Sequence, residues 1–156
     1  MTRRQEREDP RMAGRGGFTI VEVLMVLVII SILAVLAQPN LHRALVRARA
    51  VEVFADMDVI ERAVHEYQAS NNRWPEERSP GEIPGGLEAF LPGGFDFIKE
   101  NYILDYDNWS GVAAAPFQVG LAFICDDAEL RRAVLEILGS NAWTNGSTKV
   151  TRILES

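Results

Sequence analysis

The stretch RGGFTIVEVLMVLVIISILAVLAQP, from Arg15 to Pro39, decides how this chain of 156 residues is organised. Its part from Phe18 to Ala37 is 20 residues long, and Glu22 is the one charged residue in it. A helix rises about 1.5 Å per residue, so this part would be about 30 Å long, as thick as the hydrocarbon core of a bilayer. A secretory signal usually has a shorter apolar core of about 7–15 residues. A membrane helix is therefore the first interpretation, and a signal cut after Ala37 is the second.

Glu22 is unusual inside an apolar run of this kind. An unpaired charge in the middle of a bilayer costs about 3 kcal/mol, and less near a helix end. One interpretation is a carboxylate that reaches back to water. The other is a carboxylate that pairs with a cation. Gly16-Gly17 is an open junction before the bulky Phe18, and cleavage after Gly17 would create such a cation, the α-amino group of Phe18, four residues before Glu22.

The sequence GGFTIVEVLMVLVIISILAVLAQP resembles the N-terminal signal of type IV pilins and type II secretion pseudopilins. The resemblance covers residues 14–39 strongly and the rest of the chain loosely. It implies that a prepilin peptidase cuts between Gly17 and Phe18 and that the new N-terminus of Phe18 is methylated. It also implies that Glu22 guides assembly by meeting the Phe18 amine of an adjacent subunit. Pro39 matches the proline that weakens the helix just after the apolar run in that family.

The helical pattern continues beyond Pro39. Apolar residues recur at intervals of three and four as far as Tyr67, and charged residues fill the other faces, which predicts one helix from Thr19 to about Ala69. Pro39 removes one backbone hydrogen bond and is expected to kink or locally melt this helix. We expect three parts: a cleaved basic leader (1–17), the transmembrane half of the helix (18–38), and an extracytoplasmic α+β domain (39–156).

The remainder of the chain predicts a small antiparallel sheet. Residues 70–86 have the composition of a loop, and a short helix is expected from Gly86 to Leu91. Strands are expected in NYILDYDNWSG, FQVGLAFICD and STKVTRILES, with further strand in SGVAAAP between the first two. A helix in DDAELRRAVLEILGS would be capped by Asp126 or Asp127. The predicted fold class is α+β and pilin-like: a long N-terminal helix packed on this sheet, with an additional helix in the C-terminal region.

Charge limits the partners. Residues 1–17 contain five arginines and three acidic residues, a net charge of +2, so from −6 for the whole chain residues 18–156 carry −8. An acidic body without a basic stripe excludes nucleic acid as an expected partner. Five arginines before the apolar run, against Arg43, Arg47 and Arg49 after it, favour a cytoplasmic N-terminus before cleavage.

Two other groups of residues are candidate sites. Asp105, Asp107 and Asn108 bring three oxygen-bearing side chains together, as calcium requires. The interpretation we favour is a strand end with solvated carboxylates, and no cofactor is expected. Cys125 and His65 are interpreted as a buried small side chain and a helical histidine rather than as a nucleophile and its base. No phosphate loop or nucleophile elbow supports an enzyme.

The sequence therefore predicts a structural filament subunit, either a type II secretion pseudopilin or a type IV pilin, assembled at the bacterial inner membrane. The single cysteine excludes the intrachain disulfide that many type IV pilins carry, which favours the pseudopilin. The expected partners are copies of the chain or related subunits, a prepilin peptidase, the assembly platform of the filament and the lipid bilayer. The alternative is a membrane-anchored periplasmic binding domain that does not polymerise. A membrane-tethered hydrolase is a third possibility.

Overall fold

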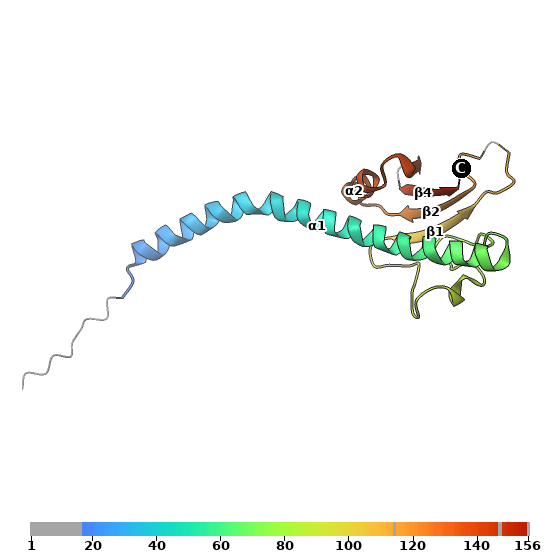
Figure 1. The fold of residues 1–156 in the computed structure, drawn as a ribbon. Helices are drawn as coiled ribbons and strands as arrows, with labels where there is room; N and C mark the ends of the chain where they lie inside the picture. Colours follow the sequence, from blue (N-terminus) through green and yellow to red (C-terminus); the bar gives the residue numbers. More distant parts are fainter. Residues whose placement is uncertain (1–16, 114, 147, 156) are drawn as a thin grey trace, which may run out of the picture. The chain divides into compact units, whose positions relative to one another are not determined.

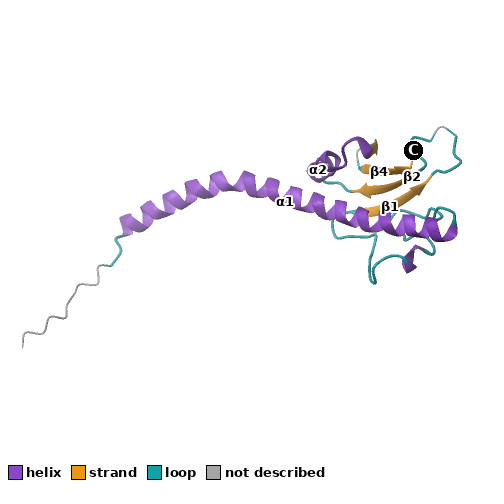
Figure 2. Cartoon of the chain, viewed as in Figure 1, coloured by secondary structure: helices purple, strands orange, loops and turns teal. Residues whose placement is uncertain are grey.

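A computed structural model describes residues 17–113, 115–146 and 148–155 of the chain (Figure 1). The chain divides into two units, Met1–Asn40 and Leu41–Ser156. The predicted leader, apart from Gly17, lies outside the described residues. The secondary structure is that of an α+β protein, as predicted (Figure 2).

The helix α1 comprises Ile20–Asn71, so it contributes to both units. It ends two residues later than predicted, where Asn72 adopts a positive φ of 52° and Pro75 follows. Pro39 lies inside α1 and the residues on both sides of it are helical. The chain is therefore not locally melted at Pro39, and the predicted kink stays a prediction.

Four antiparallel strands form one sheet in the order β1-β2-β4-β3. They comprise Ile103–Asn108 (β1), Val119–Ile124 (β2), Ala142–Asn145 (β3) and Lys149–Glu155 (β4). The strand β3 was not predicted, and the described residues of SGVAAAP contain no strand, contrary to expectation. One edge of the sheet is protected, because the Leu104 carbonyl of β1 accepts a hydrogen bond from the Gly81 N–H and the Leu104 N–H donates to the Phe97 carbonyl.

The helix α2 comprises Ala128–Leu138, and two single turns, η1 (Leu87–Ala89) and η2 (Gly139–Asn141), complete the elements. Asp127 caps α2 as predicted, since its side chain accepts hydrogen bonds from the backbone of Glu129 and Leu130. The predicted helix at Gly86–Leu91 is reduced to η1.

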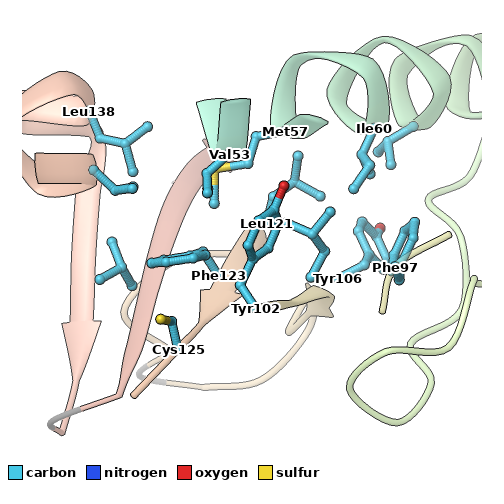
Figure 3. Close-up of a cluster of buried hydrophobic side chains, with 14 of the residues drawn as sticks. Val53, Met57, Ile60, Phe97, Tyr102, Tyr106, Leu121, Phe123, Cys125 and Leu138 are labelled. Atoms are coloured by element: carbon cyan, nitrogen blue, oxygen red, sulfur yellow. The ribbon is translucent and has the colours of Figure 1, made fainter. Parts of the chain in front are cut away.

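The core of the second unit lies between α1 and one face of the sheet. Figure 3 shows Val53, Met57 and Ile60 of α1 on one side and Tyr106, Leu121 and Phe123 of the strands on the other. All six side chains are at most 1% exposed. Leu138 of α2 joins the same cluster. Cys125 is buried with 7% exposure, which confirms its interpretation as a small buried side chain.

Candidate functional site: the first turn of α1 and the apolar half-helix

Gly17 and Phe18 lie directly before α1 and are exposed. A Cβ atom at Gly17 would meet no atom of the described residues within 4 Å. The described fold therefore places no steric demand for glycine at this position. Phe18 is 80% exposed and Gly17 is exposed as well, so the described residues do not cover the junction between them.

Thr19 and Glu22 begin the helix. The backbone N–H of Glu22 donates to Thr19 Oγ1 at 3.2 Å, and the N–H of Val23 donates to the Thr19 carbonyl at 3.2 Å. Thr19 is thus the N-cap, and Glu22 occupies the third helical position, the Thr-x-x-Glu arrangement of a capping box. A carboxylate in the first turn of a helix gains about 0.3–1 kcal/mol from the helix dipole. Sequence reasoning missed this role of Glu22, although the letters TIVE carry the signal.

The first half of α1 is apolar on all sides. Its large hydrophobic side chains from Phe18 to Leu36 are between 48% (Val23) and 80% exposed. Ser31 satisfies its hydroxyl inside the helix by donating to the Leu27 carbonyl at 2.7 Å. Among the described residues, α1 is the one helix long and apolar enough to cross a membrane. A surface of this kind needs lipid or other helices to cover it, and it anchors the chain to a membrane.

The predicted oxygen cluster of β1 is a buried ion pair. Lys149 Nζ of β4 donates to Asp105 Oδ2 at 3.0 Å and to Asp107 Oδ1 at 2.8 Å. The two aspartates are 4% and 2% exposed, so the expectation of solvated carboxylates is wrong. Asn108 instead donates to the Pro75 carbonyl at 2.8 Å. An ammonium group therefore stands where the calcium hypothesis requires a metal ion.

Burial raises the pKa of Asp107, and the hydrogen bond from Lys149 offsets this only in part. Burial lowers the pKa of Lys149, but its hydrogen bonds to Asp107 and Asp105 outweigh burial, so the pKa is raised overall. Asp107 Oδ2 and Thr151 Oγ1 are buried, and neither has a hydrogen-bond partner among the described residues. Within the described ranges, no group of three or more His, Cys, Asp or Glu side chains is placed to hold a metal ion.

Acidic residues of α1 form ion pairs with residues that follow the helix in the chain. The pattern of charged residues along α1 did not predict this role. Arg152 of β4 pairs with Asp58 at 2.5 Å and with Glu61 at 2.8 Å. Lys99 pairs with Asp56 at 3.1 Å. His65 lies edge-on against Trp74 with ring centroids 5.7 Å apart, so its described contacts are structural.

Comparison with known proteins identifies a family that has the N-terminal segment and the apolar half-helix described above. The model of the prokaryotic N-terminal methylation motif matches residues 12–37. Type II secretion system core protein G of Klebsiella michiganensis is 31% identical over 109 residues, which cover 65% of this chain and 72% of that protein. The chain belongs to the type II secretion system core protein G family. The core protein G of Klebsiella pneumoniae is 36% identical, with 63% of this chain and 71% of that protein covered.

The likeness extends to pilins. Type IV major pilin protein PilE1 of Neisseria gonorrhoeae is 29% identical, with 64% of this chain and 55% of that protein covered. No solved structure gives a significant match. These relatives are named as components of a secretion system and a pilus, not as enzymes, and they agree with a structural subunit of a filament. Membership of this family, with the methylation motif, indicates self-association in filaments and prepilin processing.

Proposed function

We propose that this chain is a structural subunit of a type II secretion pseudopilus. The precursor is inserted in the bacterial inner membrane by residues 18–38, with its N-terminus in the cytoplasm and residues 39–156 outside. A prepilin peptidase then hydrolyses the Gly17–Phe18 bond, which leaves a carboxylate on Gly17 and an amine on Phe18. Methylation of that amine and transfer to an assembly platform in the membrane precede entry into the filament.

One observation carries this proposal. The segment from Gly17 to Glu22 is exposed and leads into a helix that is apolar on all sides. The described fold does not require a glycine at Gly17. The conformation alone explains neither the glycine nor the uncovered apolar surface. A peptidase that approaches the backbone at Gly17, and neighbouring subunits that cover the apolar half-helix, explain both.

Glu22 pairs with the Phe18 amine of an adjacent subunit in this proposal. A carboxylate in hydrocarbon is tolerated when a cation meets it there. Cleavage supplies that cation at the right depth, four residues before Glu22. This contact between subunits would fix the axial shift of one helix relative to the next. Each subunit would use its Phe18 amine for one neighbour and its Glu22 carboxylate for another.

The variant Glu22→Gln tests the pairing with little disturbance of the helix start, because glutamine also completes a capping box. Insertion and cleavage are expected to stay near wild type, and the fraction of processed protein in sheared filaments is expected to fall. A mixture of variant and wild-type chains should assemble better than the variant alone, since one side of each mixed contact remains. Normal incorporation of Glu22→Gln would refute the pairing.

A type IV pilus subunit is the second candidate, and the likeness to the gonococcal pilin favours it. The two candidates differ in what the host loses when the gene is deleted. Loss of secreted proteins from the culture medium supports the pseudopilus. Loss of surface pili with normal secretion supports the pilus.

A further inference from the structure

A short basic stretch follows the apolar run, although the rest of the body is strongly acidic. Residues 38–51 contain no acidic residue and three basic ones: Arg43, Arg47 and Arg49. Residues 52–156 contain 8 basic and 18 acidic residues, a net charge of −10. The two regions therefore differ in the sign of their charge, and the positive region is the one that comes directly after the apolar run in the chain.

Arg43 and Arg47 are four residues apart in α1, so their side chains share one side of the helix. Both belong to the second unit, and both are exposed. Neither has an ion pair with another described residue, whereas the adjacent His42 pairs with Glu129 of α2 at 2.6 Å. We call Arg43 and Arg47 the arginine pair. The described residues leave both guanidinium groups open to an external partner.

The arginine pair is close to the apolar run along the chain. Arg43 comes six residues after Ala37, the last residue of the run, and all residues between them are helical. Six helical residues span at most about 9 Å, whatever the direction of the helix at Pro39. The polar layer on each side of a hydrocarbon core is about 5–7 Å thick, and a long arginine side chain can extend its charged end into that layer. The charge of Arg43 is therefore expected near the lipid phosphates, with Arg47 one turn further out.

We propose that the arginine pair binds the headgroups of anionic phospholipids in the outer leaflet of the membrane. The proposal rests on the membrane insertion that is part of the proposed function, and it adds the class of lipid that the chain selects. A guanidinium group binds a phosphate through two parallel hydrogen bonds. A zwitterionic headgroup also carries a phosphate, but its own ammonium group compensates that charge. An anionic headgroup has no such compensation, so it gains more from a nearby arginine.

This contact gives the outer arginines a role that topology does not give them. Basic residues next to a membrane segment usually lie on its cytoplasmic side, and the arginine pair lies on the outer side in the proposed topology. Proposed cleavage removes the five arginines of residues 1–17 from the inner side. Binding of the arginine pair to outer phosphates would then hold the helix at a fixed depth until the filament takes up the subunit. The acidic body of a second copy is the competing partner for these two charges.

A fluorophore attached to Ala44→Cys in the full-length chain reports which lipids surround the arginine pair. Position 44 is exposed and lies between the two arginines in the sequence, and the native Cys125 is buried. The chain is inserted in phosphatidylcholine vesicles that contain a small fraction of spin-labelled phosphatidylglycerol or, in parallel, spin-labelled phosphatidylcholine, with the quenching nitroxide just beneath the headgroup. Each arginine near an anionic surface contributes about fivefold, so the binding ratio of phosphatidylglycerol to phosphatidylcholine at the label is expected to be about 20.

Arg43→Gln and Arg47→Gln are each expected to lower this ratio about fivefold, and the double variant should bring it close to one. Arg78→Gln is the matched control, because it removes the same charge at an exposed position in the loop after α1, and it should stay within about twofold of wild type. A higher salt concentration should lower the ratio of the wild type, since exposed charges are screened.

Equal quenching by the two lipids in the wild type, or an unchanged ratio in the double variant, would overturn the proposal. Loss of filaments in the double variant with a wild-type lipid ratio would overturn it too, because the arginine pair would then serve a neighbouring subunit. Wild-type chains that do not float with the vesicles would show that residues 18–38 do not insert, which refutes the insertion in the proposed function together with this contact. Insertion without preference for the anionic lipid refutes the contact alone.

Discussion

Lys149→Met removes the β4 cation that pairs with Asp105 and Asp107 of β1, and it leaves both buried carboxylates without that cation. Lys149 Nζ lies 3.0 Å from Asp105 Oδ2 and 2.8 Å from Asp107 Oδ1, and the side chains of the two aspartates are 5% and 4% exposed. Loss of one partner from a buried pair costs about 3–5 kcal/mol, because the remaining charge has no compensation. The Lys149 side chain keeps 23% exposure, which puts the expected loss near the lower end, about 3 kcal/mol at neutral pH.

Thermal and urea unfolding of a fragment comprising residues 41–156 measures this loss. For a domain of this size about 3 kcal/mol corresponds to a fall in Tm of about 10 °C. The loss should shrink toward pH 4, because burial raises the pKa of Asp107 and its protonation removes one of the two unpaired charges. Lys99→Met is the matched control: Lys99 pairs with the partly exposed Asp56, and its loss should cost about 1 kcal/mol or less.

The triple variant Lys149→Met, Asp105→Asn, Asp107→Asn should recover most of the stability, because no unpaired charge remains buried. The reasoning would be refuted if Lys149→Met lowered the free energy of unfolding by less than about 1 kcal/mol, as Lys99→Met is expected to do. A loss that small is typical of an exposed ion pair.

Three further predictions concern other parts of the chain. Burial raises the pKa of Asp107 above the ordinary value of 3.8, so its folded form holds a proton that the unfolded form releases. Wild type should therefore lose stability relative to Asp107→Asn as the pH rises above about 4, and a constant difference between their urea midpoints contradicts this. Gly17→Leu should block cleavage without disturbing α1. If the N-terminus of this variant is nevertheless Phe18, the peptidase does not require glycine at this position. The fragment 41–156 should be a monomer with a mixed helix and strand circular dichroism spectrum, and an unfolded or purely helical spectrum would show that the body does not form its α+β fold alone.

The sequence was sufficient for α1, because its signals are local. Apolar residues at intervals of three and four run from the membrane segment to Tyr67, and Asn71, Asn72 and Pro75 end the pattern where the helix ends. The processing segment could also be predicted from the sequence, since Gly17, Phe18 and Glu22 lie within six consecutive residues of the chain. The capping role of Thr19 is just as local, but the same residue Glu22 is also a charge within an apolar run, and the two signals overlap in the letters TIVE.

Long-range pairing explains the failures. Asp105 and Asp107 look like a solvated strand end, because their partner Lys149 is more than 40 residues away and nothing near it indicates a buried cation. The strand β3 is four residues long and has no alternating pattern of its own. It exists because Ala142–Asn145 pairs with Lys149–Arg152 of β4. Sheet pairing of this kind depends on what lies opposite rather than on the segment itself.

The state of the chain inside purified filaments tests the central claim most directly. Filaments sheared from cells that express the natural gene are digested, and mass spectrometry identifies the N-terminal peptide of this chain. The account predicts a chain that begins at Phe18, with one methyl group on its α-amine, as a component of the filament. A chain that begins at Met1 or Gln38, or that stays in the membrane and is absent from the filaments, would contradict it.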